Sequence, residues 1–593
     1  MPNGKKSKRT NIIMLAVALF LILVGDLLAF MVQTDGGNIR VSDVRFEGTD
    51  GIIISALLYV PKSATASNKA PGILAIHGYM LTRETQDGFA IEFARRGYVV
   101  LAIDQTGHGY STGAANDSGF GAPDALRYLR SLDMVDTNNI GMEGFSTGAM
   151  ASVYAANKAK DDYKSVVMIG FGYPILTSTF PRNLAVIESV WDEWSAFAWG
   201  VPVAKDVVKS AILKKAFGTN DDVVVGKLYG SFADGTARKL YQPRNIHNGD
   251  YFAPAAIGDA VGWFQATLDG GNALPPADQI WLWKEIGNLI ALIGMVMLFF
   301  PVGSLLLRAN FFKGLDEAPA KPKSAKGIAW WISAIIIVVL APLTYFTFTE
   351  YATRFKISPT QIFPQPFTAG LLGWLLLVGL IALALFLIWH FAFNRKAKAT
   401  ASDYGLTWGK KLDWAKIGKS FLLAFLVAFV GYLTLVFSAW LFNVDFRFWL
   451  FNVKPMSLVQ FRMFLSYLIP FIVYFIILGL VLNGQLRPTR KGMEFSMRSE
   501  MAINVALLVL GFLGLLAFQY IPFVMGHPLP VGTTANNVLY TVLAFEIVPM
   551  LTIVALGYTY FYRKTGHIYV GALLSAILVT WIIVASQTIG MAL

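Results

Sequence analysis

Cysteine is absent from this 593-residue chain, and its absence excludes several kinds of chemistry. Without cysteine there are no disulfides, no thiolate nucleophile and no sulfur ligands for a metal. Histidine is scarce as well: the chain has six, and no two of them show the i, i+4 spacing of a metal-binding helix. We therefore expect no metal and no other cofactor.

Charged residues are also few, at 15% of the chain, whereas 55% of it is hydrophobic. The apolar excess is uneven, because residues 38–280 resemble an ordinary globular domain and almost everything after Ile280 consists of long apolar runs. The net charge of +12 would suit a nucleic-acid partner, but its basic residues lie in short loops between those runs. That placement indicates membrane topology, and we expect no nucleic-acid partner.

Nine apolar segments are long enough to cross a bilayer, which takes about 20 helical residues. The first is 12–32, and a cleaved signal peptide is the alternative interpretation because Asp26 shortens its uninterrupted apolar run. No small-x-small cleavage site follows, so we predict a retained anchor. The other predicted spans are 282–307, 328–349, 367–392, 417–442, 460–483, 501–525, 536–560 and 568–591.

The basic residues of the loops alternate with these spans. One set of loops carries Arg308, Lys313, Lys321, Lys323, Lys326, Arg395, Lys396, Lys398, Lys410, Lys411, Lys416, Arg487, Arg490, Lys491, Arg498, Arg563 and Lys564. The opposite short loops carry only Arg354, Lys356, Arg447 and Lys454. By the positive-inside rule, the N-terminus is cytoplasmic and residues 33–280 lie outside.

The outer segment alternates short apolar strands with helices. Strands are predicted at 41–46, 52–59, 71–78, 98–104, 140–143, 165–170, 183–188 and 237–241, and helices at 84–96, 122–132, 149–158 and 254–268. This alternation predicts an α/β fold with a doubly wound, mostly parallel sheet.

The pattern G-x-S-x-G occurs twice, around Ser146 and around Ser111. In a nucleophile elbow the serine occupies a sharp strand-to-helix turn. Ser146 has a strand directly before it and a helix directly after it, whereas about ten loop residues separate Ser111 from the next helix. We therefore predict Ser146 as the nucleophile and Ser111 as a structural turn serine.

Three motifs together resemble the α/β-hydrolase family over about residues 38–270. They are the strand-terminal His77-Gly78, the loop from Asp104 to Ser111 with its Gly107-His108-Gly109, and the pentapeptide Gly144–Gly148. The resemblance implies a serine hydrolase. The membrane half resembles no family that we can assign.

A serine hydroxyl needs a base to accept its proton. His77, His108 and His247 are the histidines outside the membrane half, and the family order Ser, Asp or Glu, then His implies His247. The resemblance likewise implies Asp192 as the residue that orients the histidine, with Glu193 and Glu188 as alternatives. The plain alternative for both His247 and Asp192 is a surface role.

An oxyanion hole needs two N–H donors. The resemblance implies the backbone of Thr147, directly after the nucleophile, and a second donor after His77-Gly78. Tyr79 is the first choice for that donor and Met80 the second.

Residues 194–236 form a predicted cap segment, in which 203–217 alternates apolar residues with lysines. It is interpreted either as a lid lying on anionic lipid headgroups or as an amphipathic helix packed on the sheet. Within the membrane, charged residues mark function by default, so Glu546 and then Asp26 are candidates. The alternative for each is a polar contact between helices.

The predicted division comprises a cytoplasmic N-terminus (1–10), an anchor helix (11–32), an extracytoplasmic α/β-hydrolase domain (33–272), a linker (273–281) and a membrane domain of about eight helices (282–593). The predicted function is an esterase of the plasma membrane that cleaves lipid-like or envelope-attached acyl esters through an acyl-enzyme, with the bilayer and the ester as its partners. One alternative is an acyltransferase or peptidase with the same triad. Another is a transporter or receptor whose hydrolase-like domain only binds ligand.

Overall fold

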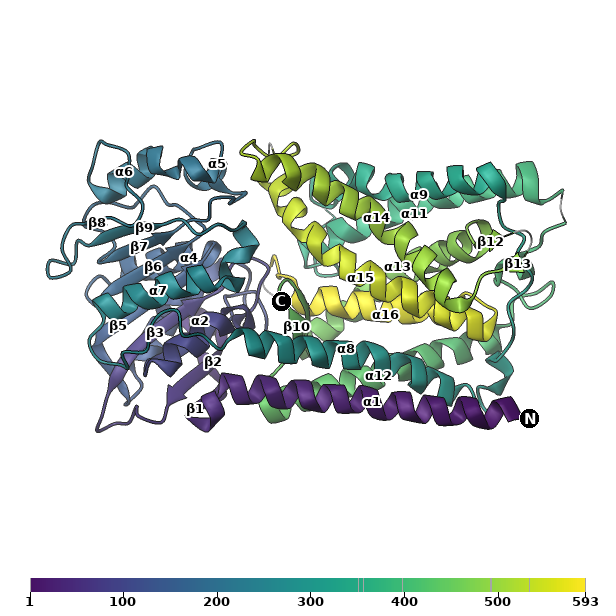
Figure 1. The fold of residues 1–593 in the computed structure, drawn as a ribbon, viewed down its shortest axis with the longest axis horizontal. Helices are drawn as coiled ribbons and strands as arrows, with labels where there is room; N and C mark the ends of the chain where they lie inside the picture. Colours follow the sequence, from purple (N-terminus) through teal and green to yellow (C-terminus); the bar gives the residue numbers. More distant parts are fainter. Residues whose placement is uncertain are drawn as a thin grey trace.

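The computed structural model describes residues 2–349, 351–355, 357–396, 398–490, 493–532 and 534–591. A domain built on a β-sheet lies at one end of a long bundle of helices, with the N-terminus at the far end of the bundle (Figure 1). Lys356 and Lys491, both counted in the loop charges, lie outside the described residues.

Among the described residues, nine helices are long and apolar enough to cross a membrane, as the sequence predicts. They are α1 (Pro2–Gln33), α8 (Leu282–Leu306), α9 (Gly327–Thr349), α11 (Pro366–Trp389), α12 (Trp414–Phe442), α13 (Leu458–Leu480), α14 (Met497–Val524), α15 (Ala535–Thr565) and α16 (Tyr569–Ser586). Every residue of the apolar window of α16 is buried, so this helix occupies the centre of the bundle.

Helix α1 packs closely against α8 because small residues line their contact. A Cβ atom added to Gly25 would lie 2.5 Å from the carbonyl oxygen of Gly287. One added to Gly294 would lie 2.8 Å from the carbonyl oxygen of Ala18. Such close backbone approach is how membrane helices gain packing energy where lipid is as apolar as the side chains.

The described residues form a nine-stranded sheet in the order β1-β2-β4-β3-β5-β6-β7-β9-β8. Its strands are β1 (Ile39–Glu47), β2 (Ile53–Pro61), β3 (Ala70–Ile76), β4 (Val99–Ile103), β5 (Val135–Phe145), β6 (Ser165–Ile169), β7 (Leu184–Ile187), β8 (Leu228–Tyr229) and β9 (Arg238–Tyr241). The six strands from β4 to β9 in this order pair in parallel, and β1, β2 and β8 pair antiparallel at the edges. The predicted fold class is confirmed.

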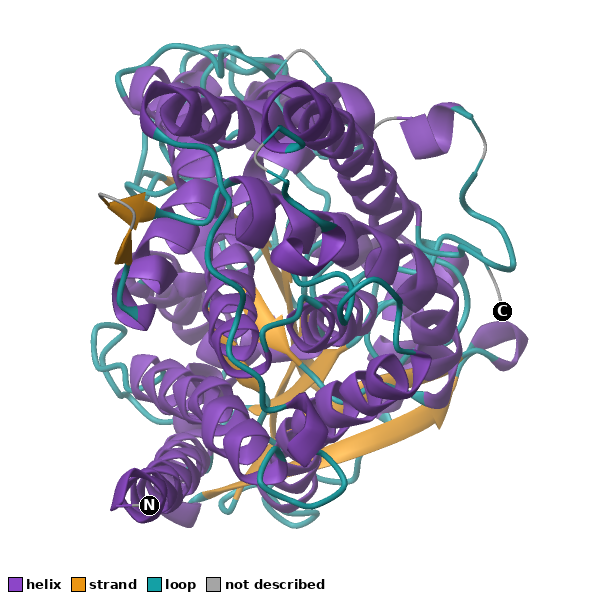
Figure 2. Ribbon diagram, turned by 90° about the vertical axis from the view of Figure 1, so that its right-hand side faces the viewer, coloured by secondary structure: helices purple, strands orange, loops and turns teal. Residues whose placement is uncertain are grey.

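Helices cover both faces of the sheet, which buries its apolar strands on both sides. One face packs against α2 (Asp87–Arg95) and α7 (Pro254–Thr267), and the other against α3 (Ala122–Arg130) and α4 (Thr147–Lys158). Seen from the far end of the bundle, the helices of the bundle lie in front of the sheet (Figure 2).

The predicted amphipathic segment 203–217 is two short helices instead of one. The 3-10 helix η5 (Ala204–Lys209) and α6 (Ala211–Phe217) meet at Ser210, whose ψ of 131° breaks the helical path. The apolar side chains Val207, Leu213 and Ala216 are fully buried in the core of the sheet domain. The apolar positions of this segment therefore serve packing on the domain.

The two ends of the bundle differ in what their loops contact. At the far end, Lys323 pairs with Asp403 at 3.0 Å, which joins two of the basic loops. At the near end, the backbone of Ile589, beyond α16, exchanges hydrogen bonds with Gly107 and Ala115 of the sheet domain. A hairpin of β10 (Phe446–Phe448) and β11 (Phe451–Val453) also lies at this end.

Candidate active site

Ser146 lies between β5 and α4 in a backbone conformation that is rare for a residue with a side chain, with φ 54° and ψ −117°. The flanking glycines are required by space. A Cβ atom at Gly144 would lie 2.1 Å from the carbonyl oxygen of Gly148, and one at Gly148 would lie 2.1 Å from that of Ile76. The turn therefore holds a strained serine at the carboxyl edge of the sheet, as a nucleophile elbow requires.

The structure brings Ser146, His247 and Asp192 together. His247 Nε2 lies 3.0 Å from Ser146 Oγ, and His247 Nδ1 lies 2.6 Å from Asp192 Oδ2. An ionised carboxylate only accepts, so Nδ1 carries the proton and Nε2 can accept one from the serine. The arrangement matches that of an acyl-transfer triad.

Asp192 and His247 each lie in a loop that follows the end of a strand. Asp192 follows β7, and its Oδ1 accepts a hydrogen bond from the backbone N–H of Trp194 at 2.7 Å. His247 begins the 3-10 helix η6 (His247–Phe252) after β9, and a bridge between Trp191 and Ile246 joins the two loops. Because β7 and β9 are parallel neighbours, their exit loops emerge at the same edge.

The predicted oxyanion-hole residues border the same serine. Thr147 is the first residue of α4, where a helix leaves an N–H group without an intrahelical acceptor. Tyr79 and Met80 line the cavity over Ser146, and Met80 has a positive φ of 61°. The sequence left open which of these two is the second donor, and both lie within the loop that follows β3.

His77 supports that loop and does not contact Ser146. Its Nε2 accepts a hydrogen bond from the backbone N–H of Gln105 at 3.0 Å, so its Nδ1 donates to the Gly78 carbonyl at 2.7 Å. Burial lowers the pKa of His77 to about 4, which keeps the ring neutral. Likewise, burial lowers the pKa of His108 to about 3.

Ser111 is a buried turn serine. Its hydroxyl donates to the Asp104 carbonyl at 2.7 Å and accepts from the backbone N–H of Ser55 at 2.9 Å. Both interactions tie the second pentapeptide to β2 and β4, so its hydroxyl is committed to structure.

The two alternative acids, Glu193 and Glu188, have other surroundings. Glu193 accepts from the backbone N–H of His247 at 2.8 Å and from the Tyr520 hydroxyl of α14 at 2.6 Å. Burial and then the neighbouring Asp192 raise the pKa of Glu193 to about 7. Burial raises the pKa of Glu188 well above its ordinary value. Among the described residues, the carboxylate bonded to the imidazole is that of Asp192.

A cavity of about 130 Å³ opens beside Ser146, and both halves of the chain build it. The sheet domain contributes Tyr79, Met80, Leu81, Phe145, Ser146, Thr147, Phe171, Trp194, His247 and Asn248. The membrane half contributes Leu450, Leu539, Val542, Leu543 and Glu546. Except for Glu546, sequence reasoning missed this second set. The signal present was the spacing 539, 542, 543 and 546, which places these residues on one face of α15.

Asp26, the other membrane candidate, lies elsewhere. Its Oδ2 accepts a hydrogen bond of 2.6 Å from Ser438 Oγ, which joins α1 to α12. This contact fits the alternative of a polar link between helices.

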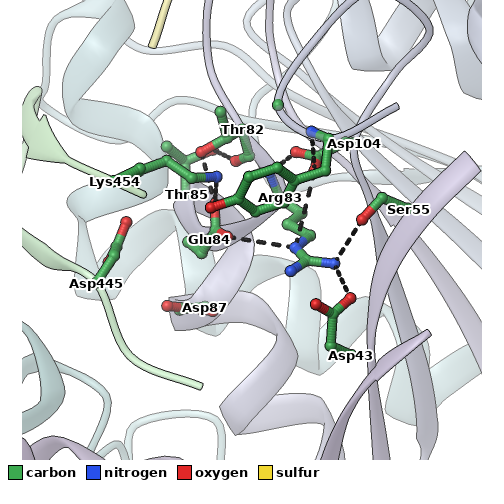
Figure 3. Close-up of polar contacts among 12 residues, drawn as sticks. Asp43, Ser55, Thr82, Arg83, Glu84, Thr85, Asp87, Asp104, Asp445 and Lys454 are labelled. Atoms are coloured by element: carbon green, nitrogen blue, oxygen red, sulfur yellow. Dashed lines mark hydrogen bonds and ion pairs between the residues drawn. The ribbon is translucent and has the colours of Figure 1, made fainter. Parts of the chain in front are cut away.

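A buried ion cluster joins the two halves (Figure 3). Lys454, which follows β11, donates to Glu84 at 2.6 Å, while Arg83 binds Asp43 at 2.7 Å and Ser55 at 2.8 Å. Burial alone would raise the pKa of Glu84, but Lys454, Arg83 and Arg447 together hold it well below its ordinary value. Buried charges are tolerated only when paired, so this cluster depends on both halves.

No metal site is evident in the described part of the chain, where no three histidine, aspartate or glutamate side chains are grouped to hold an ion.

Comparison with known proteins gives one family match: the model for X-Pro dipeptidyl-peptidase (S15 family) matches residues 50–197. No curated protein sequence matches the chain. Among solved structures, a Pyrococcus furiosus esterase is 16% identical, with 40% of this chain and 94% of that chain covered at a TM-score of 0.29. A CIB-like hydrolase from Thermoplasma acidophilum is 14% identical, with 38% of this chain and 95% of that chain covered at a TM-score of 0.27.

A further structure, DcsB in complex with its substrate analogue, is 24% identical over 22% of this chain, at a TM-score of 0.20. This chain covers 44% of DcsB, less than half of its length.

The mostly parallel sheet and the family match identify the sheet domain as an α/β-hydrolase domain. The chain thus combines a hydrolase-type domain with a bundle of apolar helices. The family match ends at residue 197, and the bundle remains without an assigned family.

Proposed function

We propose that this protein is a membrane-embedded serine hydrolase that cleaves carboxylic esters through an acyl-enzyme. The observation that carries this proposal is the chain of hydrogen bonds from Asp192 through His247 to Ser146, which ends at a cavity. A serine in this setting is activated by its histidine, and the carboxylate holds the correct tautomer.

In the proposed reaction, Ser146 Oγ attacks the ester carbonyl and its proton passes to His247 Nε2. The N–H groups of Thr147 and of Tyr79 or Met80 stabilise the oxyanion. Collapse breaks the ester bond, and the imidazolium gives its proton to the departing alcohol. Water then attacks the acyl-enzyme and loses a proton to His247. The bond to Ser146 Oγ breaks, Oγ takes that proton back from His247, and the acid is released.

The proposed location is the outer face of the plasma membrane. The loops rich in lysine and arginine lie at the end of the bundle away from the hydrolase domain, and basic loops favour the cytoplasm. Because the chain has no native cysteine, single cysteines can report the topology. We expect an impermeant maleimide to label Lys69→Cys on intact cells, and Lys410→Cys only after permeabilisation. The reverse pattern would contradict the placement.

Lipid-like esters are the proposed substrates because a membrane helix forms one wall of the cavity. Helix α15 has 31 residues, a length of about 46 Å at 1.5 Å per residue, compared with about 30 Å for the hydrocarbon core. Its wall residues Leu539, Val542 and Leu543 lie in the first three turns, near the hydrolase domain. An ester held there would lie near the outer surface of the bilayer.

A fluorophosphonate probe tests the nucleophile in intact membranes. We expect labelling of the wild type and of Ser111→Ala, and no labelling of Ser146→Ala. Labelling that persists in Ser146→Ala would refute the assignment. Absence of labelling in all three proteins would favour a domain that only binds ligand.

Peptide cleavage is a second candidate, and the match of residues 50–197 to the X-Pro dipeptidyl-peptidase model favours it. A matched ester and amide with the same acyl group distinguish the two. Turnover of the amide at a rate comparable to that of the ester would favour the peptidase.

A further inference from the structure

Of the described residues that line the cavity beside Ser146, Glu546 is the one with a carboxylate side chain. It belongs to the stripe of Leu539, Val542, Leu543 and Glu546, whose spacing of three, four and seven residues puts them on one side of α15. Seven residues of helix correspond to about 10 Å, so Glu546 lies that much further along α15 than Leu539. The wall that α15 contributes is thus apolar near Leu539, toward the start of the helix, and acidic near Glu546, further along it.

The side chain of Glu546 is partly exposed, unlike the fully buried polar groups of the bundle. Within the described part of the chain, Glu546 takes part in no ion pair or side-chain hydrogen bond. Asp26, in contrast, is bonded to Ser438. A carboxylate that linked helices would show such a contact, so helix packing does not explain Glu546.

The surroundings of Glu546 favour a cation. Pro549 lies inside α15 and has no N–H, so the carbonyl of Phe545 loses its helical donor. The partial negative charge of this carbonyl, one residue before Glu546 in the chain, is therefore not offset by a backbone donor of the helix. An unpaired charge among apolar side chains is costly, and an opposite charge that binds beside it offsets part of that cost.

We propose that Glu546 binds a positively charged ammonium group of the substrate while Ser146 attacks its ester. This inference rests on the proposed function, because it assumes that the cavity holds the substrate. An ammonium group could come from a lipid headgroup or from a small water-soluble ester, and the chemistry at Glu546 is the same for both.

Two substrate pairs distinguish these sources. In solution, the butyrate ester of choline is compared with that of 3,3-dimethylbutanol, its uncharged isostere. In vesicles, phosphatidylcholine is compared with phosphatidylglycerol of the same acyl chains. The full-length wild type should prefer the ammonium member of at least one pair by about tenfold in kcat/KM, as expected for a charge-assisted contact. Preference in only one pair identifies the source.

The variant Glu546→Gln keeps the shape of the side chain and removes its charge. We expect it to lower the preference to a ratio of about one, since its amide no longer attracts the cation. Asp26→Asn is the matched control, because it removes a membrane carboxylate that does not line the cavity, and it should keep the wild-type ratio. Equal losses on both members of a pair would contradict the proposal, because they would show a structural or catalytic role.

Binding can also be measured without turnover. Choline should slow fluorophosphonate labelling of Ser146 at concentrations about tenfold lower than 3,3-dimethylbutanol does, and Glu546→Gln should abolish this difference. Labelling without any advantage for choline would overturn the cation site alone. Absence of labelling would instead overturn the proposed function, so the two failures are distinguishable.

Discussion

Ser146 and Ser111 share the same pentapeptide pattern, but their hydroxyls have different surroundings. Ser146 has a positive φ and a histidine nitrogen at 3.0 Å, while the hydroxyl of Ser111 is bonded to two backbone groups. The pattern constrains only the turn. The environment of the hydroxyl decides whether it can act as a nucleophile.

The contact between Asp192 and His247 leads to a prediction at this scale. Replacing Asp192 with Asn should lower kcat/KM for a soluble ester by about 10³–10⁴-fold, because the amide can hold the imidazole in the wrong tautomer. The measurement is steady-state hydrolysis in detergent. Glu188→Gln is the control, since burial raises the pKa of Glu188 well above its ordinary value and the neutral amide resembles its protonated form. Similar losses in both variants would argue against Asp192.

At the scale of elements, the loop that carries His247 is held by pieces that are distant in sequence. Glu193 accepts the N–H of His247 and the hydroxyl of Tyr520 from α14. Trp449, between β10 and β11, donates to the Asn248 carbonyl at 2.6 Å, and its ring lies against Phe545 of α15. The position of His247 therefore depends on three elements of the membrane half.

Tyr520→Phe tests this dependence through a pH profile. The hydroxyl of Tyr520 stabilises ionised Glu193, whose pKa is about 7, so its removal should raise that pKa further. We expect the acidic limb of kcat to move to higher pH, and kcat at neutral pH to fall by about tenfold, because one hydrogen bond to a charged group is lost.

The matched control for this variant is Tyr558→Phe, whose hydroxyl donates to the Phe475 carbonyl inside the bundle. It should leave the pH profile in place. A shift of the same size in both variants would mean that the effect comes from general loosening of the bundle.

At the scale of the whole molecule, the hydrolase domain is fastened to the bundle by buried charge. Glu84 lies among Arg83, Lys454 and Arg447, and the last two come from the loop between α12 and α13. Removing one partner of a buried ion pair typically costs about 3–5 kcal/mol when the other charge is left without compensation, and less when, as for Glu84, other cations remain beside it.

Lys454→Met should therefore destabilise the protein by about 1–3 kcal/mol and loosen the domain from the bundle. Thermal unfolding in detergent and hydrogen exchange of residues 82–87 would measure the two effects. In the double-mutant cycle with Glu84→Gln, the combined loss should be smaller than the sum, with a coupling of about 1–3 kcal/mol. Additive losses would show that this pair does not couple the halves.

Much of the candidate site could be predicted from sequence because its signals are local. The glycines beside Ser146 report a tight turn, and the resemblance to the α/β-hydrolase family, carried by three short motifs, implied Asp192 and His247. The nine apolar helices were also predictable from the sequence, because crossing a bilayer requires apolar runs of a certain length. Over 203–217, where one of two interpretations was an amphipathic helix packed on the sheet, the chain is broken at Ser210 into two short helices, and Val207 and Leu213 pack in the domain core.

The sequence by itself determined the class of each part: a strand–serine–helix turn, an alternating α/β domain and long apolar helices. Only the tertiary structure decided which residues share a cavity. Leu450, Leu539 and Glu546 reach Ser146 across several hundred residues, and Tyr520 reaches Glu193 in the same way. The reason is physical: periodicity and turn chemistry act within a few residues of the chain, whereas contacts between helices and the sheet domain are set by how the assembled surfaces pack.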